Sequence, residues 1–224
     1  MNGYLRPRTI EEALEIQRAL KTKLKITPLK KPPVLIAAAD ASFSDDLVFA
    51  AASLYRYPPL VHTEDAFARG KARFPYIPGL FAFREGDPII SALKKLKTMP
   101  DLILVDGQGI AHPNGIGIAS HLGVLLGIPT IGCAKSRLVG EYDEPRSERG
   151  SWTHLYLNGT KVGAVVRTRD NVKPVFISPG HLMDIDSAVE IVLKCISGFR
   201  IPEPLRTADR LSKEMKRDYE AGLP

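Results

Sequence analysis

The sequence is poor in cysteine and lacks a long hydrophobic run. Its two cysteines, Cys133 and Cys195, are too few for a disulfide framework or for a zinc site built from thiolates. Residues 1–8 contain no apolar segment of the kind that directs secretion, so we expect a cytoplasmic protein. The uncharged segment 113–134 contains five glycines and Pro129, and it fits a helix followed by a strand better than a membrane span.

The composition is that of an ordinary globular protein. The chain is 44% hydrophobic and 25% charged, which excludes a disordered or fibrous protein. A length of 224 residues without an internal repeat or a linker predicts one domain over residues 1–224, with a monomer as the default. Lysine and arginine number 31 against 25 aspartates and glutamates, and the net charge of +6 favours an anionic partner.

Hydrophobic periodicity predicts an α/β fold with a mixed central sheet flanked by helices. Thr9 and Glu12 form a capping box that starts the first helix. Three strands joined by short polar links should pair antiparallel, and a later strand–helix–strand unit should pair in parallel. Asn158-Gly159 is a strong turn signal that predicts a hairpin.

The segments can be given bounds from the same patterns. The predicted strands cover residues 34–40, 47–57, 61–68, 102–106, 130–134, 155–157 and 161–168, with an edge strand at 175–178. The predicted helices cover residues 9–25, 77–97 with an interruption near 86–88, 117–126, 184–196 and 205–219.

Carboxylates occur at three particular places in this order of elements. Asp40 ends the first predicted strand, Asp106 ends the fourth, and Glu85 lies in the helical segment between them. If these two strands are neighbours, the aspartates meet at one edge of the sheet, where the helix can add Glu85. Three hard oxygen ligands would favour Mg²⁺ or Mn²⁺. Any one of these acids could instead be a solvated residue at the end of an element, but the end of a buried strand is an expensive place for an unused charge.

Seven motifs follow one another along the chain. They are Phe74–Leu80, Phe83–Glu85, Asp106–Gly109, Ala111–Pro113, Gly117–His121, Ala134–Leu138 and Ser178–His181. In this order they resemble the endonuclease V family of deoxyinosine-specific repair nucleases, and the resemblance extends from about residue 10 to residue 205. It implies an RNase H-like fold and inosine-containing DNA as the partner. It also implies Mg²⁺-dependent hydrolysis of the second phosphodiester 3′ to a deaminated adenine, leaving 3′-hydroxyl and 5′-phosphate ends.

The resemblance also assigns roles to individual side chains. Asp40 and Asp106 match the metal ligands of the family, and Glu85 matches its third acidic residue. Lys135 follows a predicted strand and could contact a phosphate oxygen or the attacking water. His112 could be a second-shell ligand, a proton carrier or a lesion contact. The family usually has a β-branched residue before the first aspartate; Ala39 stands there in this chain, which alters packing but leaves the ligand assignment intact.

The proline-flanked aromatic residue suits the opening of a base pair. Pro75 and Pro78 restrict the backbone on both sides of Tyr76, so the loop would hold a rigid ring at low cost in entropy. Such a ring could part a base pair while one base is extruded into a pocket whose glycines allow close approach of the backbone. The residues expected at the lesion are Pro75, Tyr76, Ile77, Pro78, Gly79, Leu80, Gly109, Gly115, Ile116 and Gly117.

Three other functions compete with this interpretation. An RNase H-like module could bind inosine without cutting, although the three acids argue against it. Some members of the family prefer inosine in RNA, and the sequence leaves DNA or RNA open. A hydrolase using Ser178, His181 and Asp184 would need a Gly-x-Ser-x-Gly turn, which the chain lacks, so these residues are better explained as a structural turn.

The last predicted helix carries a row of basic side chains. Arg206, Arg210, Lys213 and Arg217 follow one another at spacings of four, three and four, which align on one face. Asp209, Glu214 and Asp218 are interspersed with them, and this mixture favours a solvated face over a phosphate-binding one.

Overall fold

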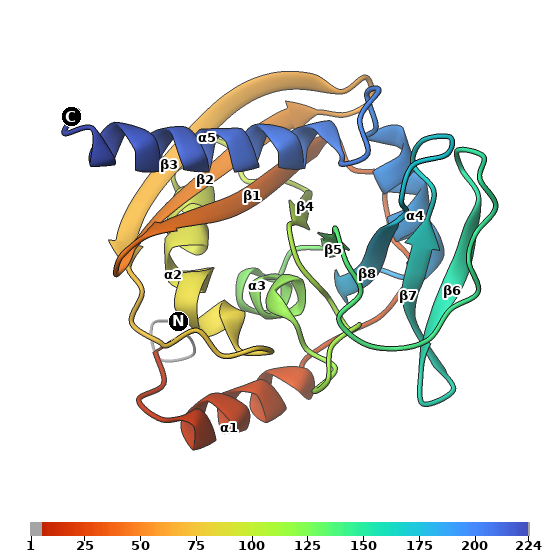
Figure 1. The fold of residues 1–224 in the computed structure, drawn as a ribbon, viewed down its shortest axis with the longest axis horizontal. Helices are drawn as coiled ribbons and strands as arrows, with labels where there is room; N and C mark the ends of the chain where they lie inside the picture. The colour runs from red at the N-terminus through yellow and green to blue at the C-terminus, as the bar shows by residue number, and fades with distance from the viewer. Residues whose placement is uncertain (1–5, 224) are drawn as a thin grey trace.

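A mixed sheet organises the part of the chain that the computed structural model describes, residues 6–223. In these residues eight strands run in the order β3-β2-β1-β4-β5-β8-β7-β6, with helices on both faces (Figure 1). The predicted mixed α/β architecture is therefore confirmed.

The first three strands form the predicted antiparallel meander. β1 (Leu35–Ser44) pairs with β2 (Leu47–Arg56), which pairs with β3 (Val61–Lys71). The predicted end of the first strand at Asp40 is wrong, because β1 continues for four more residues and Asp40 lies opposite Ala51. The ladder with β2 satisfies the backbone beyond Asp40, so an acidic side chain in the middle of the strand does not end it.

The parallel half of the sheet starts at β4 (Leu102–Val105), a fully buried strand. It lies parallel to β1 on one side and to β5 (Thr130–Ala134) on the other. The pairing with β5 is as predicted, and the pairing with β1 meets the condition for bringing Asp40 and Asp106 together. α3 (Ile118–Leu126) makes the crossover between β4 and β5 and ends at Gly127, whose φ of +68° suits glycine.

The strand predicted at the sheet edge is instead internal. β8 (Val175–His181) lies between β5 and β7 (Thr160–Val166), antiparallel to both, and all seven of its residues are buried. The edge position belongs to β6 (Trp152–Leu157). Asn158 and Gly159 both have positive φ values in the hairpin between β6 and β7, which confirms the predicted turn.

The helices agree with the predicted order but differ in their bounds. α1 (Ile10–Lys21) begins after Thr9, whose hydroxyl accepts a hydrogen bond from the Glu12 amide as predicted. α4 (Ile185–Lys194) and α5 (Glu203–Glu220) close the chain.

α2 (Phe81–Lys94) corrects the prediction of an interrupted helix over 77–97. It starts later because Gly79 has a φ of +83°, which a helix cannot contain. It runs through Pro88 without interruption. A Cβ atom at Gly70 of β3 would approach the Pro88 ring to 2.8 Å, so the absence of one leaves room for the proline.

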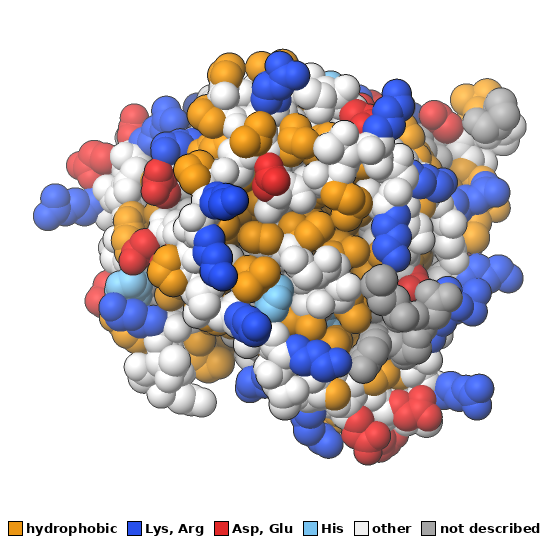
Figure 2. All heavy atoms as spheres, turned by 180° about the vertical axis from the view of Figure 1, so that it is seen from behind, with side chains coloured by type: hydrophobic (Ala, Val, Ile, Leu, Met, Phe, Trp, Pro, Cys, Tyr) orange, Lys and Arg blue, Asp and Glu red, His pale blue; other side chains and the backbone are white. Residues whose placement is uncertain are grey.

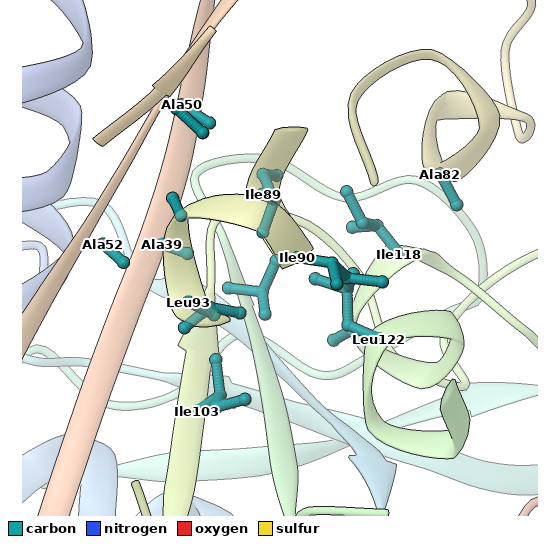
Figure 3. Packing of buried hydrophobic residues seen from close by; sticks show 14 of the residues in the cluster. Ala39, Ala50, Ala52, Ala82, Ile89, Ile90, Leu93, Ile103, Ile118 and Leu122 are labelled. Carbon is teal, nitrogen blue, oxygen red and sulfur yellow. The ribbon is translucent and has the colours of Figure 1, made fainter. Parts of the chain in front are cut away.

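Alternate residues of the central strands face two different cores. Ala37 and Ala39 of β1 pack with Ile103 of β4 under α2 and α3, whereas Ala38 and Leu104 pack under α4 and α5. Figure 3 shows Ile89 and Leu93 of α2 close to the small side chains of the meander, with Ile90 directed toward Ile118 and Leu122 of α3. The alanines of β1 and β2 therefore let α2 pack closely against the sheet.

The surface is basic without being uniformly so. Figure 2 shows lysine and arginine side chains distributed over one face among hydrophobic and acidic ones. No helix in residues 6–223 is both long and apolar enough to cross a membrane.

Candidate active site

The pairing of β1 with β4 brings Asp40 and Asp106 together. Ala39 lies beside Val105 in the parallel register, and each is followed directly by its aspartate. Asp40 lies two residues after Ala38, and Asp106 lies two residues after Leu104. Ala38 and Leu104 belong to the core beneath α5, and residues two apart along a strand share a face, so both aspartates lie on the side of α5. β1 continues past this point while β4 ends, so Asp106 begins a loop against the side of a strand.

A third carboxylate reaches these two from α5. Asp209 offers an oxygen that lies, with one from Asp40 and one from Asp106, in a group whose members are all within 4.8 Å of one another. This group, here called the aspartate cluster, has only oxygen donors. Such a donor set fits a hard divalent cation such as Mg²⁺ or Mn²⁺ and does not suit a metal that prefers thiolate.

The energetics of these carboxylates reflect their crowding. Burial, together with the charge of Asp106, raises the pKa of Asp40 to about 7. Burial also acts to raise the pKa of Asp209, but a hydrogen bond from Lys213 and the charge of Lys135 outweigh it, so the pKa of Asp209 is lowered. The cluster therefore accumulates negative charge that a bound cation would stabilise.

Glu85 approaches the same point from α2. It lines one cavity with Asp40 and Asp106. Burial raises its pKa to about 8, with further contributions from the charges of Asp40 and Asp106. Glu85 is thus electrostatically coupled to the aspartates but does not belong to the aspartate cluster, so its part as a metal ligand stays a prediction.

Lys135 lies directly after β5 and contacts the aspartate cluster. Its Nζ donates a hydrogen bond to Asp106 Oδ2 at 2.7 Å and is 3.7 Å from Asp209 Oδ1. Burial opposes the charge of this ammonium, but the hydrogen bond to Asp106 and the neighbouring acids outweigh it, and the pKa of Lys135 is raised. A protonated amine therefore stands beside the acids.

A cavity of about 540 Å³ opens beside the acids, and four of the ten residues predicted at the lesion line it. We call it the lesion cavity after that prediction. Predicted site residues on its wall are Asp40, Tyr76, Gly79, Glu85, Asp106, His112, Ile116 and Gly117. Those outside its lining are Pro75, Ile77, Pro78, Leu80, Gly109, Gly115 and Lys135.

Tyr76 projects from the loop between β3 and α2. It is 67% exposed, and its ring contacts that of Phe81 with 5.0 Å between centroids. Phe74, at the start of the loop, is buried, and its carbonyl accepts a hydrogen bond from Arg84. An exposed ring on an anchored loop at the mouth of a cavity can contact a large planar ligand.

Known proteins share both the sequence and this architecture. The sequence model of Endonuclease V matches residues 18–210. Over 213 residues the chain is 49% identical to Endonuclease V of Geotalea uraniireducens, covering 95% of this chain and 91% of that protein. The chain belongs to the endonuclease V family.

Solved endonuclease V structures agree with the fold. That from Streptomyces avermitilis is 39% identical, with a TM-score of 0.93 and coverage of 98% of this chain and 97% of the other. One from Ciona intestinalis is 25% identical, with a TM-score of 0.81 and coverage of 94% and 98%; it was crystallised with a 24mer DNA containing an inosine followed by a ribo-adenosine. The predicted family and RNase H-like fold are confirmed, and membership of the endonuclease V family indicates a nuclease.

Within this endonuclease V fold, His112 is buried and uncharged at neutral pH. Burial lowers its pKa to about 4. Its Nδ1 accepts a hydrogen bond from the Asn114 amide at 3.2 Å. On the other side, a Cβ atom at Gly79 would lie 3.3 Å from its Nε2. A neutral imidazole on the cavity wall can orient a polar ligand without adding charge.

The serine, histidine and aspartate considered as a hydrolase triad are structural. Ser178 Oγ accepts hydrogen bonds from the Gly109 and Ala111 amides. His181 Nδ1 accepts one from the Lys25 amide. Asp184 is the N-cap of α4 and accepts from the Ser187 amide. Each residue thus supports backbone, as predicted, and none is directed at another.

Sequence reasoning missed Asp209 and Gln17. The sequence places Asp209 among several acids on a solvated helix face; in the structure Ala208 and Ser212 are buried, so Asp209 lies at the border of that face. Gln17 of α1 is 2% exposed and lines the lesion cavity. No motif marks it, because an isolated glutamine in an amphipathic helix carries no pattern.

Proposed function

We propose that this chain is a Mg²⁺-dependent endonuclease that recognises deoxyinosine in DNA. It would hydrolyse the second phosphodiester 3′ to the lesion, leaving 3′-hydroxyl and 5′-phosphate ends. The observation that carries the proposal is the aspartate cluster at the edge of a cavity bordered by an exposed aromatic loop. Family membership supports the same chemistry.

Asp40, Asp106 and Asp209 would hold the metal, with Glu85 facing it across the lesion cavity. When bound, a divalent ion supplies charge neutralisation for the phosphate and lowers the pKa of water. Mn²⁺ would substitute because it accepts the same oxygen donors. In the metal-free protein the raised pKa values of Asp40 and Glu85 favour their protonated forms near neutral pH, so metal binding would release protons from this site.

Lys135 would stabilise the negative charge that develops on the phosphate. Its ammonium already stands 2.7 Å from Asp106, so it reaches the place where the phosphate must approach the acids. A cation fixed there by an ion pair needs little reorganisation during the reaction.

The lesion cavity would receive the extruded base. Tyr76 would replace the lost stacking in the duplex, while the Gly79, Ile116 and Gly117 backbone would surround the hypoxanthine edge. His112, which is uncharged, would be a further hydrogen-bonding group on the cavity wall. Backbone groups placed at the edge of the base would read its shape and its hydrogen-bonding pattern.

The decisive experiment compares four labelled strands of one sequence. Each carries inosine or adenosine at one position, as DNA or as RNA, and is incubated with the protein and Mg²⁺. We expect cleavage of the inosine DNA only, one nucleotide beyond the lesion, with a phosphate on the downstream product. Binding without cleavage would support the inosine-binding module instead, and preferred cleavage of the RNA would assign an endoribonuclease.

A further inference from the structure

A second cavity lies on the other side of the catalytic acids from the lesion cavity. Its volume is about 420 Å³, and we call it the Phe199 cavity. Asp106 lines both cavities, while Lys135 and Asp209 line only the second. The acids therefore lie between the two cavities. A nucleic-acid strand that passes over the acids must enter both cavities.

The wall of the Phe199 cavity combines an aromatic ring with cations. Phe199 precedes α5 and is 49% exposed. The guanidinium of Arg206 lies over its ring, with Cζ 3.3 Å from the centroid, and is held there by a 2.6 Å hydrogen bond to Glu203. The second face of a half-exposed ring braced in this way can stack on a base.

Charge favours an anionic chain in this cavity. Four cations line it, Lys135, Arg200, Arg206 and Arg210, against three carboxylates, of which Asp106 and Asp209 belong to the aspartate cluster. Once a divalent ion neutralises the cluster, the wall is positive through Lys135 and Arg200, because Arg206 is already paired with Glu203 and Arg210 with Glu214. Arg200 also donates to the backbone carbonyl of Lys135, so the cavity is built together with the catalytic lysine.

We propose that the Phe199 cavity binds the part of the DNA strand immediately 3′ to the bond that is cut, with Phe199 stacking on a downstream base. The inference rests on the proposed function, which places the lesion in the other cavity and the cut 3′ to it. A strand entering by the lesion cavity and crossing the acids leaves through the Phe199 cavity, and that direction is 5′ to 3′. The site would also hold the new 5′-phosphate end after hydrolysis.

The test measures affinity as a function of strand length on each side of the lesion. The short strand carries inosine and ends one nucleotide beyond it; two longer strands add about four nucleotides at the 3′ end or at the 5′ end. All are single-stranded, and binding is measured by fluorescence anisotropy in Ca²⁺. For each protein the readout is the ratio of affinities, longer over short.

Wild-type protein should gain affinity from the 3′ extension, and Phe199→Ala should reduce that gain by about 5-fold to 100-fold, the usual worth of stacking on one base. Phe199→Trp should restore it. Tyr156→Ala, which removes an exposed ring of β6 far along the sheet, is the matched control and should retain the gain. Melting temperatures establish that the variants are folded.

Two results would overturn the inference while leaving the proposed function intact. One is an unchanged 3′ gain in Phe199→Ala; the other is a loss confined to the 5′ extension, which would reverse the direction of the strand. If the wild-type protein binds the inosine strand no better than its adenosine counterpart, the proposed function fails, and the inference fails with it.

Discussion

Each aspartate of the cluster carries a charge that its two neighbours oppose. Removing one should therefore affect catalysis much more than folding. We expect Asp106→Asn to reduce cleavage by about 100-fold or more, because it loses a charge from the metal ligands. Binding of inosine DNA in Ca²⁺ should persist. Asp45→Asn, an exposed turn residue with positive φ that asparagine also adopts, is the control. Normal turnover of Asp106→Asn would refute the assignment.

Lys135 should act on the rate more than on the affinity. The ammonium gains most when charge develops on the phosphate, so Lys135→Ala should slow single-turnover cleavage by about 10-fold to 100-fold, the worth of a charged hydrogen bond. The Kd for inosine DNA should change far less. Lys194→Ala, which removes an exposed lysine paired with Glu190, serves as the control. An equal loss in the cleavage rate and in the affinity for inosine DNA would make Lys135 a positioning group.

Glu85 gives the metal-free protein a pH-dependent stability. Its folded pKa of about 8 lies above its ordinary value of 4.5, so folding favours the protonated form. The contribution of Glu85 to the free energy of unfolding is therefore fully present below about pH 4.5 and is lost as the pH rises through 8. The melting temperature in EDTA should fall between pH 6 and pH 8.5, and Glu85→Gln should flatten this fall. An identical slope in the variant would contradict the raised pKa.

At the scale of elements, the loop before α2 is the feature most exposed to a duplex. Tyr76→Ala should weaken binding to inosine duplexes by about 1–3 kcal/mol, and Tyr76→Phe should restore most of it because the ring, not the hydroxyl, stacks. The loss should shrink on single strands, which have no base pair to part. Equal losses on both substrates together with a lowered melting temperature would make Tyr76 a structural residue.

α1 ties two walls of the lesion cavity together. The side-chain amide of Gln17 donates to the carbonyls of Gly79 and Ile116, and its oxygen accepts from Asn114. Gln17→Leu leaves buried polar groups unpaired and should lower the free energy of unfolding by about 1–3 kcal/mol in urea titrations. Glu15→Ala, exposed on the same helix, should change it by about 0.5 kcal/mol or less. Equal effects would exclude a tethering role.

Local sequence patterns predicted those elements whose formation depends only on residues nearby in the chain. The turn at Asn158-Gly159, the cap at Thr9 and the apolar run of β4 each require only their own neighbours. β8 was misplaced because Pro179 and Gly180 resemble the end of a short edge strand. Its internal position depends on pairing with β5 on one side and β7 on the other, which a local pattern does not reveal. The extension of β1 past Asp40 was missed for the same reason, since β2 supplies its partners.

At the scale of the whole molecule, the site lies where the meander meets the parallel strands. The sequence made the meeting of Asp40 and Asp106 conditional on β1 and β4 being neighbours, and their parallel pairing meets that condition. No local pattern could supply Asp209, since its place depends on how α5 crosses β1 and β2 (Figure 1). The two cavities share Asp106 at this junction, so the sheet places both of them beside the same acids.

The spread of the aspartate cluster along the chain also sets the order in which its parts can come together during synthesis. Its members stand at positions 40, 106 and 209. A nascent chain on the ribosome exposes the first two long before the third has left the exit tunnel. The complete cluster therefore forms only after residue 209 has emerged and α5 has packed on the sheet, and a product terminated before that point lacks the third carboxylate.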